Sequence, residues 1–194
     1  MLRVPLAPSV ARVPGVMRLA VLVVTCVVSA VACGSSVEVE PSSSNVPAVE
    51  TTPSGFDRRI GLVSKPAGDE VAMCLWVADT PETRAIGMMG SSSFGDADAM
   101  VFVSDAPTSG RFWMWNTLID LSIAFFDESG TFLDSRSMEV CRATDSADCP
   151  RYDTPIGYLS AVETVAGDLD RLSLVVGSRL ILTDEACSSS LVPQ

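Results

Sequence analysis

Residues 121–137 read LSIAFFDESGTFLDSRS, and this stretch decides the fold class. An uncharged run, Leu121–Phe126, is followed by the turn-forming residues Asp127–Gly130 and then by Thr131–Ser137, in which apolar and polar side chains are mixed. Two short strand-like runs separated by Asp, Ser and Gly are typical of a β-hairpin. The stretch therefore predicts two antiparallel strands joined by a tight turn.

Short apolar or alternating runs of the same kind recur on both sides of this hairpin. They are Val71–Ala78, Met100–Val103, Phe112–Trp115, Tyr158–Glu163 and Ser178–Thr183. One helix is expected to begin at Pro81, capped by Thr80, and to end at Gly87 or Gly90, and a second is expected over residues 167–174. The pattern predicts a mainly β fold, a compact β-sandwich or small barrel with two short helices, with an α+β fold as the alternative.

The N-terminal residues 1–32 are typical of an export signal. Arg3, Arg12 and Arg18 precede an uncharged apolar run, and small residues stand directly before Cys33. The run is shorter than the roughly 20 residues that a spanning helix needs. The arrangement resembles the lipobox of bacterial lipoproteins, in which Cys33 would be acylated, and ordinary secretion is the alternative. We therefore expect the protein in the cell envelope, at the outer face of the cytoplasmic membrane or in the periplasm, or else secreted.

Composition divides the rest of the chain into three parts. Residues 33–55 are rich in Ser, Pro, Thr and Glu and predict a disordered tether, residues 56–187 a single β-rich domain, and residues 188–194 a flexible tail. Three of the 13 basic residues lie in the signal, which leaves 24 acidic groups against 10 basic ones, a formal charge of −14. This balance excludes nucleic acid as a partner and makes a lipid chain, not charge, the expected contact with the membrane.

Three motifs carry a family resemblance. They read RAIGMMG at Arg84–Gly90, MVFV at Met100–Val103 and FWMWNTLI at Phe112–Ile119. These motifs resemble the family called domain of unknown function 192, with the pattern R-x-x-G-L-M-G, G-M-L-F-V-F and F-W-M-K-N-T-L-I-P-L-D. The resemblance covers about residues 70–183 and implies a compact, β-rich domain without an established molecular role.

The chain departs from the family pattern at charged positions. Trp115 stands where the family has Lys, and Asp120 and Ser122 stand where it has Pro and Asp. A charged site of the family, if it uses those Lys and Asp residues, is therefore not carried over to this chain.

The chain contains no histidine, which excludes Ser-His-Asp and Cys-His catalysis and His-based metal sites. Four cysteines lie in the expected domain, and an even number in an oxidising compartment predicts two disulfides. We expect Cys141–Cys149 to close the loop between them and Cys74–Cys187 to fasten the C-terminal end, although four cysteines allow three pairings. We assign no cofactor, no metal and no catalytic residue.

The candidate binding residues gather around the FWMWNT segment. If Phe112–Trp115 is a strand, Trp113 and Trp115 share one face and can bind a sugar ring or a peptide, unless a loop covers them. Glu163 is the acid on an otherwise apolar strand, where Arg84 or Arg111 can pair with it. The predicted ligand-binding residues are Trp113, Trp115, Asn116, Glu163 and Arg84.

We interpret the chain as a non-enzymatic, lipid-anchored domain that binds an unknown ligand or envelope partner in a groove near FWMWNT. One alternative is a hydrolase or isomerase that uses Glu163 with Asn116. Another is a structural or copper-handling module built on methionine sulfurs, since thioethers bind Cu(I). The same methionines also suit a core in which they fill irregular gaps. They are Met88, Met89, Met100 and Met114.

Overall fold

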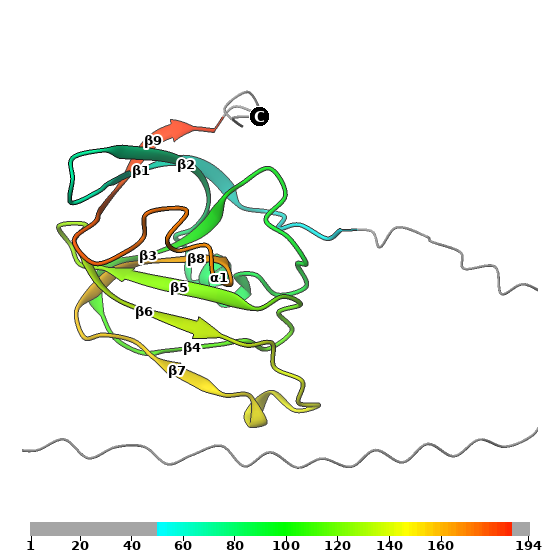
Figure 1. Ribbon diagram of the computed structural model, residues 1–194. Helices are drawn as coiled ribbons and strands as arrows, with labels where there is room; N and C mark the ends of the chain where they lie inside the picture. Colours follow the sequence, from blue (N-terminus) through cyan, green and yellow to red (C-terminus); the bar gives the residue numbers. More distant parts are fainter. Residues whose placement is uncertain (1–49, 188–194) are drawn as a thin grey trace, which may run out of the picture. The chain divides into compact units, whose positions relative to one another are not determined.

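The computed structural model describes residues 50–187, and its regular elements are mostly strands (Figure 1). The strands are β1 (Asp57–Ser64), β2 (Glu70–Ala78), β3 (Ala99–Thr108), β4 (Arg111–Trp113), β5 (Leu121–Phe126), β6 (Phe132–Met138), β7 (Arg151–Asp153), β8 (Tyr158–Val165) and β9 (Arg179–Ala186). A short helix, α1 (Pro81–Ile86), and one 3-10 turn, η1 (Ser146–Asp148), complete the described part. The export signal, Cys33, most of the tether and the tail lie outside these residues.

The predicted mainly β fold is confirmed. Seven strands form one sheet in the order β6-β5-β8-β3-β2-β1-β9, and β4 and β7 form a separate antiparallel pair. Neighbouring strands of the large sheet are antiparallel except β2 and β3, which α1 and a long loop connect. In Figure 1, β1, β2 and β9 lie above β5, β6 and β8, so the sheet folds over on itself as in a sandwich.

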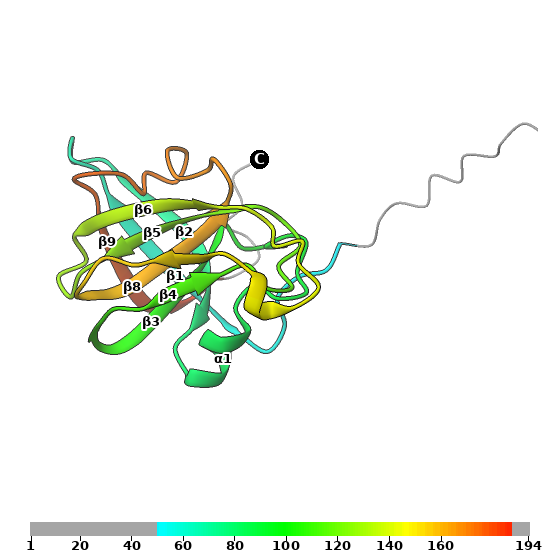
Figure 2. The same cartoon turned by 90° about the horizontal axis from the view of Figure 1, so that it is seen from below.

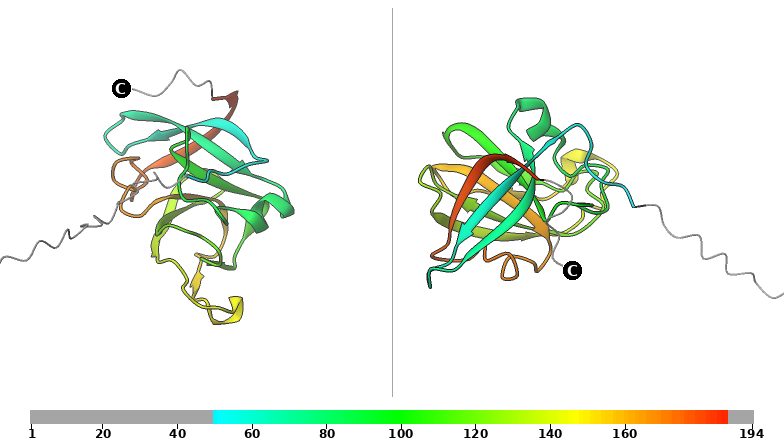
Figure 3. Two further views of the ribbon diagram at one scale, coloured as in Figure 1. Left: turned by 90° about the vertical axis from the view of Figure 1, so that its right-hand side faces the viewer. Right: turned by 90° about the horizontal axis from the view of Figure 1, so that it is seen from above.

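The two ends of the large sheet meet at the turn between β5 and β6. The backbone N–H of Leu180 donates to the carbonyl of Gly130 (2.8 Å), and that of Phe132 donates to the carbonyl of Ser178 (3.1 Å). Beyond this meeting point no ladder joins β6 to β9 in the described residues, so the sheet is not a closed barrel. Figure 3 shows β9 and β1 crossing the remaining strands in the view from above.

Each face of the sheet carries its own hydrophobic core. The inner core, between the two halves of the folded sheet, includes Val63, Leu75, Leu180, Phe126 and Val162. The outer core is covered by the β4–β7 pair and by the loops after α1 and β4, and it includes Met88, Phe94, Met100, Met114, Ile123 and Phe125. Because both faces are covered, all six residues of β5 are buried, which explains why the strand carries no charge and only one polar residue, Ser122.

Helix α1 and both disulfides match the predictions. Thr80 caps α1 in a reciprocal pair with Thr83, Pro81 lies in the first turn, and Gly87 ends the helix. Disulfides join Cys74 to Cys187 and Cys141 to Cys149. The first connects β2 to the chain just after β9, and the second closes the loop that contains η1.

Two predicted elements are wrong. Residues 167–173 form successive turns and not a helix, and positive φ values at Gly167 (90°) and Ser173 (60°) bound this segment. The strand over Phe112–Trp115 ends at Trp113, because Asn116 has a φ of 55° and reverses the chain. Strands β1 and β7 are present without having been predicted.

We predict that Gly130→Ala destabilises the fold far more than Gly157→Ala. Both glycines have a positive φ, 79° and 82°, so both substitutions carry a similar backbone cost. A Cβ at 130 would collide with the backbone carbonyl of Leu180 at the meeting point of the sheet, whereas a Cβ at 157 meets nothing within 4 Å. Urea denaturation should show a difference in unfolding free energy of about 2 kcal/mol. Equal losses would contradict the structural importance of this junction.

Candidate functional site

Glu163 lies on the outer-core face of β8, between two apolar strands. Its register partners are Met100 on β3 and Ile123 on β5. The residue is 4% exposed, and its side chain makes no hydrogen bond or ion pair within residues 50–187. Burial raises the pKa of this carboxyl to about 8, so the group is mostly protonated at neutral pH.

Arg84, predicted to pair with Glu163, makes other contacts. Its guanidinium donates to the backbone carbonyls of Asp79 (2.6 Å) and Val103 (2.8 Å). These bonds join the last turn of α1 to the end of β2 and to β3. The geometry therefore gives Arg84 a structural role.

The two tryptophans of the FWMWNT segment have different surroundings. Trp113 ends β4, opposite Arg151 of β7, and the Arg151 guanidinium carbon lies 3.8 Å from the centre of the indole ring. Trp115 lies in the turn that follows, so strand alternation does not relate the two rings. Both side chains are half-buried. The predicted groove with two indoles on one strand face is thus not formed by strand geometry.

Asn116 occupies the position where the turn needs a left-handed residue. Its φ is 55°, a conformation that Asn adopts more readily than most residues. Its carbonyl accepts a hydrogen bond from the N–H of Gly90 (2.8 Å), and the next residue, Thr117, forms an isolated β-bridge with Met89. The backbone at Asn116 thereby fastens the FWMWNT turn to the loop after α1.

This pair of loops carries an exposed apolar surface. Ile86 is 51% exposed and Leu118 is 55% exposed, one on each of the two bridged segments. Met89 and Trp115, on the same segments, are half-buried. We call these four residues the turn surface. Sequence reasoning included Trp115 among the ligand-binding residues and Met89 in the copper-handling alternative, and it missed the two aliphatic residues.

The N-terminal end of the described chain is attached next to the turn surface. Thr51 and Ser92 exchange backbone and side-chain hydrogen bonds, including Ser92 N–H to the Thr51 carbonyl at 2.8 Å and Thr51 N–H to Ser92 Oγ at 2.9 Å. Ser92 follows Met89 by three residues. In Figure 2 the cyan N-terminal segment enters on the same side of the domain as α1. The N-terminal end of the described chain is therefore fastened to the same loop, after α1, that carries Met89 of the turn surface.

The predicted methionine group is largely a core feature. Met88, Met100 and Met114 are buried in the outer core, among phenylalanine and tyrosine side chains. Met89 is half-buried. This placement matches the interpretation of methionine as a filler of irregular gaps.

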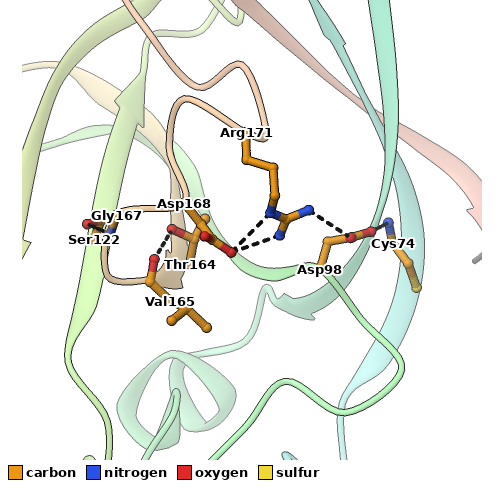
Figure 4. Close-up of polar contacts among 8 residues, drawn as sticks. All are labelled: Cys74, Asp98, Ser122, Thr164, Val165, Gly167, Asp168 and Arg171. Atoms are coloured by element: carbon orange, nitrogen blue, oxygen red, sulfur yellow. Dashed lines mark hydrogen bonds and ion pairs between the residues drawn. The ribbon is translucent and has the colours of Figure 1, made fainter. Parts of the chain in front are cut away.

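A second feature, not predicted from the sequence, is a pocket beside β6. Its volume is about 310 Å³, and one wall is the chain between β8 and β9. Within this segment Arg171 pairs with Asp168 (2.9 Å), and its guanidinium also lies 3.9 Å from Asp98, in the loop before β3, as Figure 4 shows. The sequence contains one signal of this pocket, the alternation of Ser135 and Ser137 in the strand-like run Thr131–Ser137.

Comparisons with known proteins agree with the fold. Residues 48–182 match the model of the family DUF192, described as "Uncharacterized ACR". The structure is similar to that of a protein from Sinorhizobium meliloti 1021 provisionally named as a transcription regulator, at 20% identity and a TM-score of 0.58, over 67% of this chain and 97% of that one. It is also similar to a protein of unknown function from Novosphingobium aromaticivorans DSM 12444, at 23% identity and a TM-score of 0.55, over 70% and 94% of the two chains. No curated protein matches the chain.

We predict that Glu163 makes the fold less stable as the pH rises from about 4.5 to about 8. In this window the unfolded chain has lost the proton, because its pKa is the ordinary 4.5, while the folded protein still holds it, because its pKa is about 8. Below the window the contribution is absent, and above it the loss is constant at up to ~5 kcal/mol.

Urea denaturation at several pH values tests this prediction. Glu163→Gln removes the ionisation and should flatten the decline, so that the variant is more stable than the wild type at pH 9. Glu185→Gln, at an exposed residue of β9, is the matched control and should leave the decline unchanged. Parallel pH profiles for Glu163→Gln and the wild type would show that the carboxyl is solvated.

Proposed function

We infer the role of this chain from its own structure, because it belongs to DUF192, a family described only as uncharacterized. We propose that it is a non-enzymatic binding domain, attached through Cys33 to the outer face of the cytoplasmic membrane. Its partner in this proposal is a neighbouring envelope protein, which binds at the turn surface. The observation that carries the proposal is the exposure of Ile86 and Leu118, which lie on the two segments that the Gly90–Asn116 and Met89–Thr117 backbone contacts join.

Two features support a location outside the cytoplasm. Disulfides persist in oxidising compartments and are rare in the cytoplasm, and this domain has two. Cys33 follows a segment typical of an export signal. Since Glu50 is 17 residues after Cys33, a fully extended connection would keep the domain within about 60 Å of the anchor.

The turn surface has the character of a small protein interface. Exposed aliphatic side chains at the end of α1 and in the FWMWNT turn, together with the half-buried indole of Trp115, offer apolar area whose removal from water on binding is favourable. The backbone bonds at Asn116 and Thr117 fix the two loops to each other, which lowers the entropy cost of binding. The charge of −14 after the signal disfavours an acidic partner, so the matching surface is apolar and neutral or basic.

The enzymatic alternative has one supporting observation, the raised pKa of Glu163, which would suit a general acid. Asn116, the second residue of this alternative, is exposed, and its backbone carbonyl accepts the hydrogen bond that fastens the turn. A residue that is 4% exposed also offers little contact to a substrate. The binding role therefore has the better support.

Site-specific crosslinking in the intact envelope tests the proposal. A photoreactive amino acid at Leu118, which is 55% exposed, should give a discrete crosslinked protein. The same probe at Ile181 on β9, which is 52% exposed, is the matched control and should not. Ile86→Ser should lower the yield at Leu118 about tenfold, since loss of a buried aliphatic side chain costs ~1.5 kcal/mol.

Two outcomes would contradict the proposal. Equal labelling from positions 118 and 181 would mean that the turn surface is ordinary exposed protein. If position 118 labels only lipid, the turn surface contacts the membrane surface and not a protein partner. A thermal melt of Ile86→Ser that matches the wild type shows that any loss concerns binding and not folding.

A further inference from the structure

We propose that the pocket beside β6 is a binding site for a small sugar, either neutral or carrying an amino group. The site is separate from the turn surface, and the proposal does not depend on the function assigned above. The pocket has a volume of about 310 Å³, at the lower end of the range for small-molecule sites, which suits one or two sugar rings. Its lining combines a row of hydroxyl groups, one carboxylate and an apolar wall.

The hydroxyl groups come from two paired strands. Ser122 of β5 lies opposite Ser137 of β6, and Ser135 is two residues further along the same face of β6. Ser122 is 3% exposed, and its Oγ accepts a hydrogen bond from the N–H of Gly167 (3.2 Å), which leaves the hydroxyl proton free to donate. The hydroxyls of Ser135 and Ser137 make no hydrogen bond within residues 50–187.

Such a row matches the chemistry of a sugar. Each serine hydroxyl can both donate and accept a hydrogen bond, as each sugar hydroxyl does. Asp170, also in the lining, contributes a carboxylate that has no salt-bridge partner in the described part of the chain. It can accept hydrogen bonds from two hydroxyls or pair with an ammonium group. No lysine or arginine lines the pocket, so an acidic ligand would meet uncompensated charge.

The remaining wall is apolar and can cover the C–H face of a ring. It is formed by Phe132, Leu169, Leu174, Val175 and Val176. Leu174 is 1% exposed, whereas Val176 is 80% exposed at the rim. Burial of the ring carbons against this wall adds to the hydrogen bonds on the other side.

The pocket is held in shape before any ligand binds. Arg171 pairs with Asp168 inside the wall and lies 3.9 Å from Asp98, whose Oδ2 accepts a hydrogen bond from the backbone N–H of Cys74 on β2 (2.9 Å; Figure 4). Ser178 Oγ donates to the carbonyl of Val175 (2.7 Å) at the other end of the segment. These contacts within the segment restrict its conformations, which lowers the ordering cost of binding.

An NMR titration of the full, envelope-purified protein tests the proposal, with D-glucose, D-glucosamine and D-glucuronate as probes. Glucose or glucosamine should shift the backbone amides of Ser135, Ser137 and Asp170, and glucuronate should not. Asp170→Asn should weaken glucosamine about tenfold relative to glucose, since a charged hydrogen bond contributes ~1.5 kcal/mol or more.

Variants separate binding in the pocket from binding elsewhere. Ser137→Leu fills the pocket and should abolish the localised shifts, while Ser109→Ala, at an exposed residue outside the lining, should keep them. If Ser137→Leu does not fold, the double variant Ser135→Ala/Ser137→Ala takes its place and should lower the affinity at least tenfold. Absence of localised shifts with both glucose and glucosamine, or shifts that persist in a folded pocket variant, would overturn the proposal.

Discussion

The junction at Gly130 and Leu180 is the constraint on which the rest of this structure depends. A seven-stranded sheet has two free edges, and here the turn of the β5–β6 hairpin is hydrogen-bonded to the start of β9. This contact brings the two halves of the sheet together over the inner core. Strands β6 and β9 do not pair beyond this junction. The segment between β8 and β9 lies beside β6 there and forms one wall of the pocket. The closure of the core and the existence of the pocket therefore have the same origin.

A sheet with both faces covered also explains the unusual position of Glu163. Alternation along β8 directs Val162 into the inner core and Glu163 towards the outer core. A glutamate there is only 4% exposed, so burial favours the neutral form at neutral pH. An apolar residue would fill the same space without the pH-dependent loss of stability. Because this loss of stability has no counterpart with an apolar residue, Glu163 is the core position where residue type and apolar surroundings conflict most clearly.

Local chemistry accounts for what the sequence predicted and for what it missed. The hairpin at residues 121–137, α1 with Thr80, and the two disulfides depend on short-range patterns or on cysteine number, so they could be read directly. The failures depend on backbone conformations that side-chain patterns do not reveal. Positive φ values at Gly167 and Ser173 bound the turns where a helix was predicted, and Asn116 follows the early end of a predicted strand. The pocket was missed because its lining residues are distant in sequence and meet only through the β5–β6 pairing and the following loop.

The motif that carries the family resemblance builds structure at most of its positions. Phe112 packs edge-on against Phe102 and Phe125, Met114 is buried, and Asn116 supplies the left-handed turn. What remains for function is the part of the motif that faces outward, and there the chain has Trp115 where the family pattern has Lys. An indole in place of an ammonium group changes a charged surface into an apolar one. The resemblance therefore specifies the fold, and the binding properties of this chain must follow from its own surface residues.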